Sequence, residues 1–577
     1  MADLYIYGAG NRTRYFLPLL KERFNVLAIF DNDPEKHGQE ICGVRVGPII
    51  SDSQISVCIC ITDVESALES IKPCKFPDIL FLMGYEQHGY GVIFRCLPAC
   101  APIDAIFDCE PVGVLFSGSW DIEKAPIEET AQIFDKTKPR VFNLALFPDE
   151  GQLGGSMAIH KIIRDVNMTL AEEGGISNLF SVNTTRIAVP DAAAAAPMAL
   201  PVARETDGTG GEPPTVKNPP PGFNSLCGGL PLYNRITSFW CRLLLAEHIL
   251  KKASRLFGFR NEDVFLLSEV RDAYAFARIF PGFEKVFIGY HEQGSLASVM
   301  DARGNIREFY DSVQHRVLNT FKNWIFPSTG AYEGFHDTAS ELTRRELSMI
   351  RRHICYNGFT PRDVDRKGAG GLLDLIRAKR NEQRLVFVSA TYLYKNKGVE
   401  RIPGVLAHIR ETYKRHIYWI LIGDGEKHDE VRQAIERHLH NDEYVWQTER
   451  LARQEALFAV FNDADFYIMT HHVSVFDLSI LQGMAYGCVP VLSGVGGNKE
   501  FCGYENGVLY DEAFFLGEAF QPANDRVFTD SAYLETMKEK NTGIIRSGFS
   551  DENFIRRYAR TFETAKGTVW DSNTATP

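Results

Sequence analysis

Short apolar runs alternate with amphipathic stretches along most of the chain, and this alternation predicts its secondary structure. The runs are typical of buried parallel strands and lie at 4–7, 26–30, 141–147, 264–267, 286–290, 324–326, 385–389, 418–422, 444–446, 466–469 and 489–492. Between 385–389 and 418–422, apolar residues recur at helical spacing from Val399 to Tyr413. Strands separated by helices predict an α/β protein with parallel, doubly wound sheets.

The predicted elements fall into three successive blocks, each of which predicts a Rossmann-like domain. We place the blocks at 1–135, 136–355 and 356–545, followed by a region at 546–577 with a helix and a frayed tail. The 577 residues have room for three to four domains at about 150 residues each. A low-complexity segment at 192–221 cannot fill a core, so we expect a surface loop there.

The first block opens with a strand, the turn Gly8-Ala9-Gly10, a helix, a second strand and then Asp31. This is the order of a dinucleotide-binding unit, in which the turn approaches a diphosphate and the acidic residue binds a ribose. Thr13 stands where the fingerprint has its third glycine. The pattern leaves two interpretations open, namely a cofactor site or a domain with a structural or partner-docking role.

Composition and charge argue against several classes of protein. The formal net charge is −12, which argues against a general nucleic-acid binder. The 12 cysteines form no CxxC pair, which predicts reduced thiols and no metal site. The N-terminus lacks the features of a signal peptide, and no run of about 18 apolar residues occurs. We therefore expect a cytoplasmic protein with no transmembrane segment.

The third block carries the strongest functional signal. A helix over 477–487 precedes the strand 489–492, and a turn with Gly496, Gly497 and Glu500 follows that strand. Glycines let a backbone approach a ligand closely, and the free amide groups of a helix N-terminus attract phosphate. The turn lies beyond the carboxyl end of a strand, where α/β folds bind nucleotides. A plain connection with a tight turn is the alternative.

Two further loops of the third block point to the same chemistry. The strand 385–389 runs into a loop with Lys395 and Lys397, whose ammonium groups could neutralise a diphosphate. The next strand ends in Gly423-Asp424-Gly425. The order and spacing of these loops are more specific than any one of them.

On these motifs, residues 385–500 resemble the donor-binding domain of retaining glycosyltransferases of the GT-B fold, family four (group 1). The matches are Lys397-Gly398, Gly423-Asp424-Gly425, Leu481-Gln482-Gly483-Met484-Ala485 with Gly487 and Val489-Pro490-Val491, and Gly496-Gly497 with Glu500. In the second block, the loop with Gly154-Gly155 and the segment Tyr290-His291-Glu292-Gln293-Gly294 resemble two loops of the family's N-terminal domain. The resemblance covers about 139–565.

The resemblance implies a GT-B pair of domains with a central cleft, and a hexosyltransferase type of reaction in which a sugar leaves a nucleotide diphosphate with retained anomeric configuration. A UDP- or GDP-sugar is the expected donor, and the family typically works without a bound metal or other cofactor. Positive charge and backbone donors would stabilise the departing diphosphate. The implied catalytic residues are His291, Lys397 and Asp477, and the implied donor-binding residues are Gly154, Gly155, Lys395, Gly425, Ser474, Gln482, Gly496, Gly497 and Glu500.

The sequence departs from the family at the two glutamates that family members carry with seven residues between them. Alignment places Ser474 and Gln482 at these positions. The amide of Gln482 can still hydrogen-bond ribose hydroxyls. Ser474 has no carboxylate, and Asp477, three residues later, is the residue that could compensate. The family's arginine after the first strand is also not evident, and Thr391 or Tyr392 is nearest to that position.

Two groups of basic or titratable residues are interpreted as structural. His471 and His472 follow a strand and are interpreted as loop histidines, with a position in the cleft as the alternative. Four arginines are predicted to share one helix with a solvated basic face, and attraction to an anionic acceptor or membrane surface is the alternative. They are Arg344, Arg345, Arg351 and Arg352.

The sequence as a whole favours a retaining glycosyltransferase with an extra N-terminal Rossmann-like domain. The acceptor is expected on the second block and is a glycan, a lipid-linked sugar or a protein. Peripheral membrane contact and the oligomeric state stay open. Two alternatives remain: a non-catalytic GT-B protein that binds a glycan or supports a partner enzyme, and an NAD-dependent sugar enzyme driven by the first block.

Overall fold

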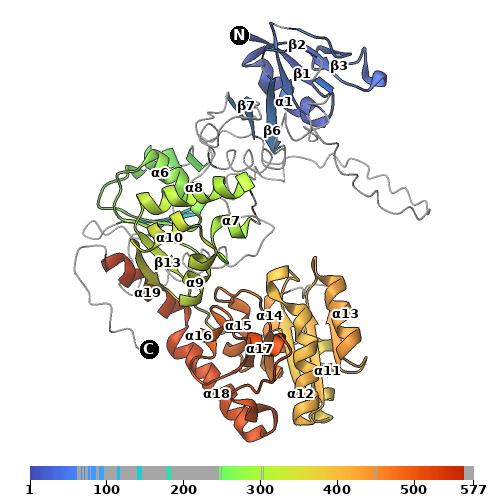
Figure 1. Cartoon of the computed structure of the whole chain (residues 1–577), viewed down its shortest axis with the longest axis vertical. Coiled ribbons are helices and arrows are strands. Elements are labelled where there is room, and N and C mark those ends of the chain that lie inside the picture. The colour runs from blue at the N-terminus through green and yellow to red at the C-terminus, as the bar shows by residue number, and fades with distance from the viewer. Residues whose placement is uncertain are drawn as a thin grey trace.

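The chain forms three sheets, one in each predicted block (Figure 1). The computed structural model describes residues 1–60 except Ser53, short stretches between 67 and 95, residues 113–116, 140–145 and 179–183, and most of 243–564. The predicted loop at 192–221 and the Gly154-Gly155 loop lie outside the described residues. The predicted α/β class with successive Rossmann-like units is confirmed.

The first sheet is mixed and has β1 at its centre, paired in parallel with both β2 and β5. Helix α1 (Asn11–Lys21) connects β1 to β2, as in a Rossmann unit. The last three strands are antiparallel, so the sheet is doubly wound only in its central part. The order β3-β4-β2-β1-β5-β6-β7-β8 comprises β1 (Ala2–Tyr7), β2 (Phe24–Phe30), β3 (Glu40–Ile41), β4 (Val44–Gly47), β5 (Ser56–Ile59), β6 (Ile79–Tyr85), β7 (Tyr90–Arg95) and β8 (Gly113–Phe116).

The second sheet is parallel throughout and has the order β10-β9-β11-β12-β13-β14. Every residue of β11, β12 and β13 is buried, as their apolar sequences predict. The strands are β9 (Val141–Ala145), β10 (Leu179–Asn183), β11 (Val264–Leu267), β12 (Val286–Gly289), β13 (Asn323–Phe326) and β14 (Arg351–Ile354). The helices are α6 (Val270–Ile279), α7 (Leu296–Val299), α8 (Gly304–Thr320), α9 (Thr329–Thr338) and α10 (Glu341–Leu347).

The prediction that four arginines share one helix is wrong. Arg344 and Arg345 lie on α10, which ends at Leu347, whereas Arg351 and Arg352 begin the edge strand β14. The backbone of β14 pairs with β13, and this sheet pairing outweighs the helical spacing of the charges. The Arg352 guanidinium lies over the Tyr332 ring, 4.5 Å from its centroid. The four residues therefore do not share the face of one helix.

The third sheet is also parallel, with the order β17-β16-β15-β18-β19-β20. This is the strand order of dinucleotide-binding folds, and it reverses between β15 and β18. The strands are β15 (Leu385–Ala390), β16 (Ile417–Ile422), β17 (Tyr444–Gln447), β18 (Phe466–Met469), β19 (Val489–Ser493) and β20 (Val508–Tyr510). The α-helices are α11 (Gly370–Asn381), α12 (Ile402–Tyr413), α13 (His428–His438), α14 (Gln454–Asp463), α15 (Leu478–Ala485), α16 (Asn498–Phe501), α17 (Glu512–Phe515) and α18 (Ser531–Gly548).

The last described helix, α19 (Asp551–Thr564), returns from the third domain to the second (Figure 1). Four of its side chains, Phe554, Ile555, Tyr558 and Phe562, form one buried cluster with residues of β9, β11, β12 and β13. The sequence predicts this helix but not its place, because an amphipathic pattern does not identify the surface that it covers. The crossing ties the second and third domains together.

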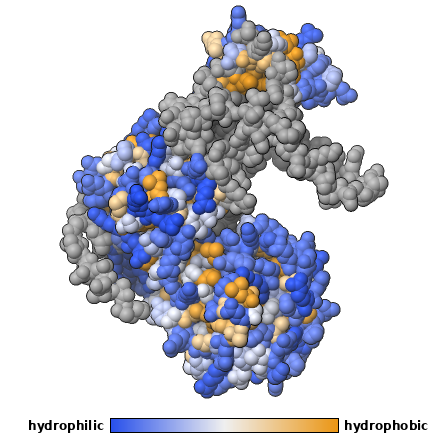
Figure 2. All heavy atoms as spheres, in the orientation of Figure 1, coloured by the Kyte–Doolittle hydropathy of each residue, from blue (hydrophilic) through white to orange (hydrophobic). Residues whose placement is uncertain are grey.

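The visible surface of the second and third domains is mainly hydrophilic, and its hydrophobic residues form small separate spots (Figure 2). Such scattered spots are normal for a folded protein in water. Among the described helices, none combines the length and apolar character that a membrane span requires.

Candidate functional site

The candidate site lies where the strand order of the third sheet reverses, between β15 and β18. The loop after β15 contains a short 3₁₀ helix, Lys395–Lys397, and the loop after β18 contains His471 and leads to Asp477. Both loops leave the carboxyl edge of the sheet, because the two strands are parallel neighbours. Ligands of open α/β sheets bind at this position.

The central contact of the site joins the two loops through three charged or polar side chains. The Nζ atom of Lys397 forms an ion pair with Oδ2 of Asp477, and Nε2 of His471 lies 3.0 Å from the same oxygen. The other carboxylate oxygen of Asp477 accepts the backbone N–H of Ser479 at 2.9 Å, which makes Asp477 the N-cap of α15. The Lys397 side chain is 24% exposed and that of His471 only 1%, so solvent or a ligand reaches the lysine.

The electrostatics of this contact favour one arrangement of protons. Burial alone would raise the pKa of the Asp477 carboxyl, but the Lys397 ammonium and the His471 hydrogen bond hold that pKa well below its usual range. Burial lowers the pKa of His471, against the hydrogen bond to Asp477, which raises it. At neutral pH the site therefore contains an ionised Asp477, a charged Lys397 and a neutral His471.

The neutral His471 ring has a defined tautomer. Its Nε2 donates to the Asp477 carboxylate, so Nδ1 carries no proton and acts as an acceptor. The Nδ2 atom of Asn498 lies 3.4 Å from this Nδ1 and also donates to the Ser493 carbonyl at 3.0 Å. The chain from Asn498 through His471 to Asp477 fixes the orientation of the carboxylate that holds Lys397.

The backbone around Lys397 is fixed by its neighbour across the sheet edge. Gly398 has a φ of +61°, and a Cβ there would overlap the carbonyl oxygen of Thr470. The Thr470 hydroxyl in turn donates to the Gly398 carbonyl at 2.6 Å, and the His472 N–H donates to the Asn396 carbonyl at 3.0 Å. The Lys397-Gly398 motif therefore requires its glycine for close packing of two loops.

The glycine-rich turn of Gly496 and Gly497 contacts the second domain. A Cβ on Gly330, in the first turn of α9, would overlap the backbone of both glycines. The hydroxyl of Ser328, the N-cap of α9, donates to a backbone carbonyl in the loop before α15, and the Gly330 N–H donates to Oε1 of Glu500 at 3.0 Å. The turn is thus built for close approach, and in this structure the approaching backbone is that of α9.

The remaining donor-binding candidates lie around this contact in different environments. The Gly497 N–H donates to the Ser474 carbonyl at 2.9 Å, and the Ser474 hydroxyl is buried without a hydrogen-bond partner among the described residues. Oε2 of Glu500 is likewise buried and unpartnered within the described part of the chain, and burial raises the pKa of this carboxyl. Gln482 lies half-buried on α15, and Lys395 is exposed.

Gly425 lies on the side of the site formed by β16. A Cβ on this glycine would come within 2.8 Å of the Leu393 backbone nitrogen and of the Tyr392 ring. The loop after β16 therefore packs closely on the loop after β15, which carries Lys395 and Lys397.

His291 lies in the second domain, two residues after the end of β12. Its Nε2 is 3.4 Å from the hydroxyl of Tyr558 on α19, so this histidine contacts the C-terminal helix. The adjacent Glu292 has a pKa raised to about 7 by burial and by the nearby Glu269, against Arg271, which lowers it. A role for His291 beside the transferred sugar stays a prediction.

Two residues of the site are not evident from the sequence. The pattern favours a loop histidine at position 471, yet His471 is buried against Asp477 at the sheet edge. Asn498 carries no motif of its own, although it directly follows the Gly496-Gly497 turn. The one signal for His471 is its position after β18, where the strand order reverses. The sequence does not show this strand order, so the signal cannot be used without the structure.

The Lys397 side chain supplies positive charge at the point where the strand order of the third sheet reverses. In the part of the chain that the structure describes, no group of three or more His, Cys, Asp and Glu side chains is arranged to hold a metal ion.

Comparison with known proteins identifies the third domain. Residues 382–519 match the family described as glycosyl transferases group 1. An uncharacterized glycosyltransferase of Methanocaldococcus jannaschii is 22% identical over 287 residues, which cover 49% of this chain and 69% of the relative. Glycogen synthase 2 of Agrobacterium fabrum is 24% identical over 318 residues, which cover 52% of this chain and 55% of the relative. The chain therefore spans little more than half the length of this second relative.

Among solved structures, sucrose-phosphate synthase from Thermosynechococcus elongatus aligns with 74% of this chain and 99% of its own. The sequence identity is 14% and the TM-score 0.48.

The third domain thus has the strand order of dinucleotide-binding folds. Its accessible lysine, Lys397, lies at the carboxyl edge of the sheet, where the strand order reverses. Residues 382–519, within this domain, match the group 1 glycosyltransferases. The resemblance predicted from the sequence is confirmed.

Proposed function

We propose that this protein is a retaining glycosyltransferase that takes a sugar from a nucleotide diphosphate sugar and binds the diphosphate at Lys397. The observation that carries the proposal is the position of Lys397, partly accessible at the reversal point of the third sheet and oriented by a buried carboxylate. An ammonium group held there neutralises the charge that develops on the departing diphosphate.

The ion pair with Asp477 prepares Lys397 for this role. A lysine side chain loses conformational entropy when it is held in one geometry. Because the ion pair already orders Lys397, less entropy is lost when a ligand binds. Asp477 remains bonded to His471 and to the Ser479 N–H when the ammonium turns toward a phosphate. The carboxylate therefore stays satisfied while Lys397 exchanges one anionic partner for another.

Other residues are assigned by the family resemblance. Gln482 binds the ribose, Gly425 and Lys395 border the nucleotide, and His291 approaches the sugar from the second domain. Ser474 and Gln482 leave the two family carboxylate positions without charge, so Asp477 supplies the acidic group nearest to them in sequence. The acceptor binds to the second domain, and the reaction proceeds without a metal ion.

Thermal stabilisation of the purified chain by UDP, GDP and ADP, and by their common sugar conjugates, tests the proposal. A ligand at 100 times its Kd stabilises the folded state by about 2.7 kcal/mol. We expect one nucleoside diphosphate to raise the Tm, with a UDP or GDP compound giving the shift. The same shift should persist in EDTA.

Two lysine variants make the test specific. Lys397→Ala should lose the shift, with an affinity at least about tenfold weaker, the equivalent of about 1.4 kcal/mol. Lys367→Ala, an exposed lysine of the same domain, is the matched control and should keep it. Wild-type affinity in Lys397→Ala would overturn the diphosphate site. A normal shift without sugar transfer to any acceptor would instead favour the non-catalytic alternative.

A further inference from the structure

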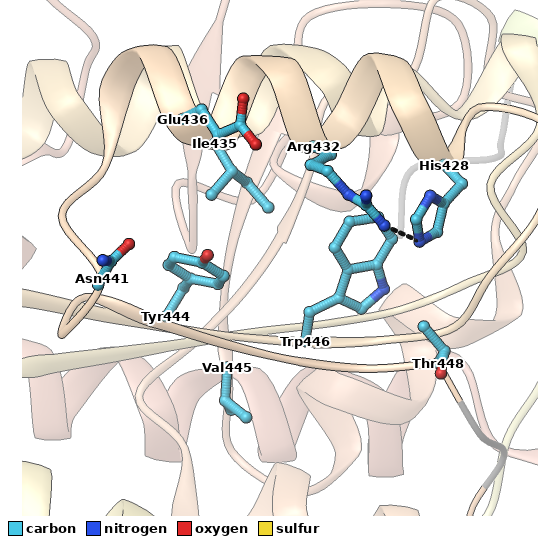
Figure 3. Close-up of a pocket in the computed structure, with 9 residues that line it drawn as sticks. All are labelled: His428, Arg432, Ile435, Glu436, Asn441, Tyr444, Val445, Trp446 and Thr448. Atoms are coloured by element: carbon cyan, nitrogen blue, oxygen red, sulfur yellow. Dashed lines mark hydrogen bonds between the residues drawn. The ribbon is translucent and has the colours of Figure 1, made fainter.

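A hollow of about 490 Å³ opens between α13 and the edge strand β17, away from the Lys397 site (Figure 3). This volume lies within the range of about 300–1,000 Å³ that is typical of small-molecule sites. β17 is separated from β15 by β16, and α13 lies at the side of the third domain that is remote from the second domain (Figure 1). The hollow is therefore distinct from the proposed donor site.

Two aromatic rings form one wall of this hollow. Tyr444 and Trp446 are two residues apart on β17, so they lie on the same face of the strand, about 7 Å apart along it. Val445 points to the opposite side (Figure 3). Trp446 is held in place because its indole N–H donates to the Gly423 carbonyl at 2.8 Å and its ring packs on His428, with centroids 4.4 Å apart. Tyr444 and Trp446 are both half-buried, so part of each ring faces the hollow.

Polar side chains of α13 form the facing wall. His428, Arg432 and Glu436 follow each other at intervals of four residues and therefore share one stripe of the helix. Arg432 donates to Nε2 of His428 at 3.3 Å, which joins the two side chains. The side chains of Glu436 and of Asn441, at the end of the hollow, form no hydrogen bond or ion pair with described residues. Their donor and acceptor groups are available to a ligand.

We propose that this groove, lined by Tyr444, Trp446, Arg432, Glu436 and Asn441, binds a neutral oligosaccharide. A pyranose ring presents C–H groups on its faces and hydroxyls at its rim, so it stacks on an aromatic ring while carboxylate, amide and guanidinium groups bond its hydroxyls. Tyrosine and tryptophan supply such rigid apolar surface at low entropic cost. One arginine and one glutamate balance in charge, which disfavours an anionic ligand.

The proposal goes beyond the glycosyltransferase activity: glycan binding in this groove does not depend on that activity, whereas the benefit of such binding for transfer does. A glycan held two strands from the donor edge would keep a polymeric acceptor or product on the protein between transfers, which raises its effective concentration. The unpaired side of β17 offers a competing use, addition of an extended peptide strand, because β17 pairs only with β16 among the described strands. The available side chains of the groove favour the glycan.

Tryptophan fluorescence of the full chain, titrated with maltohexaose, cellohexaose and chitohexaose, tests the proposal. We expect at least one of these neutral hexasaccharides to bind, and a sulfated heparin oligosaccharide not to bind. Tyr444→Ala and Glu436→Ala should each weaken binding at least about tenfold, the equivalent of about 1.4 kcal/mol. Tyr444→Phe keeps the ring and should bind nearly as wild type, and Tyr15→Ala, an exposed tyrosine of the first domain, is the control.

The outcomes separate this site from the proposed donor site. Lys397→Ala should keep hexasaccharide binding, and Tyr444→Ala should keep the nucleotide-induced Tm shift. Absence of binding for all three hexasaccharides at millimolar concentration overturns the proposal and leaves the strand edge to a peptide. Binding that Tyr444→Ala and Glu436→Ala do not alter also overturns it, because the sugar then lies elsewhere.

Discussion

The first and third domains place an aspartate at the same kind of position, the carboxyl edge of parallel strands, and use it for different partners. In the first domain, Asp31 accepts the Ala9 N–H at 2.7 Å and the Asp33 N–H at 2.9 Å, and Lys36 approaches the same carboxylate at 3.2 Å. In the third domain, Asp477 holds the side chain of Lys397.

The two carboxylates differ in whether the group that they bind remains available to a ligand. In a dinucleotide site, the amide groups of the glycine turn face the diphosphate. Asp31 already occupies the Ala9 amide, and the Thr13 hydroxyl donates to the Gly8 carbonyl, so the turn is bonded within the protein. Lys397, by contrast, is a cation that can turn from Asp477 to a phosphate. An aspartate at the sheet edge therefore stabilises the glycine turn in the first domain, whereas in the third domain it positions the ammonium group of Lys397.

Of the substitutions considered at these two sheet edges, removal of the Asp477 carboxylate should cause the largest loss of stability. Asp477→Ala leaves Lys397 without its partner in a largely buried site and removes the N-cap of α15. Removal of one member of a buried ion pair costs about 3–5 kcal/mol. Amide hydrogen exchange of peptides from β18 and α15 measures the loss locally, independently of the other domains.

The control for this experiment is Asp374→Ala, whose side chain is 78% exposed on α11 of the same domain. It should change exchange in β18 by no more than about 0.5 kcal/mol. Equal protection in Asp477→Ala and wild type would show that the carboxylate does not hold the two loops together.

The fold is predictable from the sequence wherever burial dictates the pattern. The fully buried strands β11 and β18 coincide with their apolar runs, because both faces of a parallel strand exclude polar residues. β14 escapes prediction because its exposed arginines carry no apolar signal, although its backbone completes the sheet. The place of α19 escapes prediction for a related reason, since its partner strands lie far away in sequence.

The candidate site is predictable in its residue types and only partly in its geometry. The family resemblance singles out Lys397, and it leaves Asp477 as the residue that could compensate for a missing glutamate. The contact between the two depends on β15 and β18 being neighbours. The sequence holds no local signal for that pairing, because β16 and β17 come between the two strands along the chain. The burial of His471 follows from the same pairing, so a buried histidine cannot be distinguished there from a loop histidine without the sheet order.

The pH dependence of the third domain provides the next test. His471 has a lowered pKa in the folded state, so the unfolded chain binds more protons as the pH falls below its ordinary value of about 6.5. Stability of β18 should therefore decrease below this pH, by up to about 1.4 kcal/mol per pH unit for one proton. Asp477 titrates well below this window, and Glu292, with its pKa raised to about 7, acts in the opposite direction.

Comparison with a variant isolates the histidine from these other groups. His471→Gln keeps an amide donor for Asp477 and should flatten the decrease of exchange protection between about pH 6.5 and about pH 5, where an ordinary histidine becomes protonated. His416→Gln, an exposed histidine beside β16, should leave the slope unchanged. A wild-type slope in His471→Gln would contradict the assignment of a buried neutral ring.

The smallest expected effect concerns the glycine turn of the first domain. Gly10 has an ordinary φ of −93°, and a Cβ there meets nothing within 4 Å, whereas Gly8 has a φ of +101°. Gly10→Ala should therefore change stability by no more than about 0.5 kcal/mol, while Gly8→Ala should cost about 1–2 kcal/mol because the left-handed region is strained for alanine. Exchange in β1 and α1 measures both.

If a ligand binds at this turn, Gly10 has a functional role instead of a neutral one. The open space beside its backbone would then hold a diphosphate. We expect NAD to leave the Tm of the wild-type chain unchanged, since Asp31 already binds the Ala9 amide. A shift with NAD that Gly10→Val abolishes would show instead that Asp31 releases the turn to a cofactor. The two aspartates would then play the same part, each holding a binding group until the ligand replaces it.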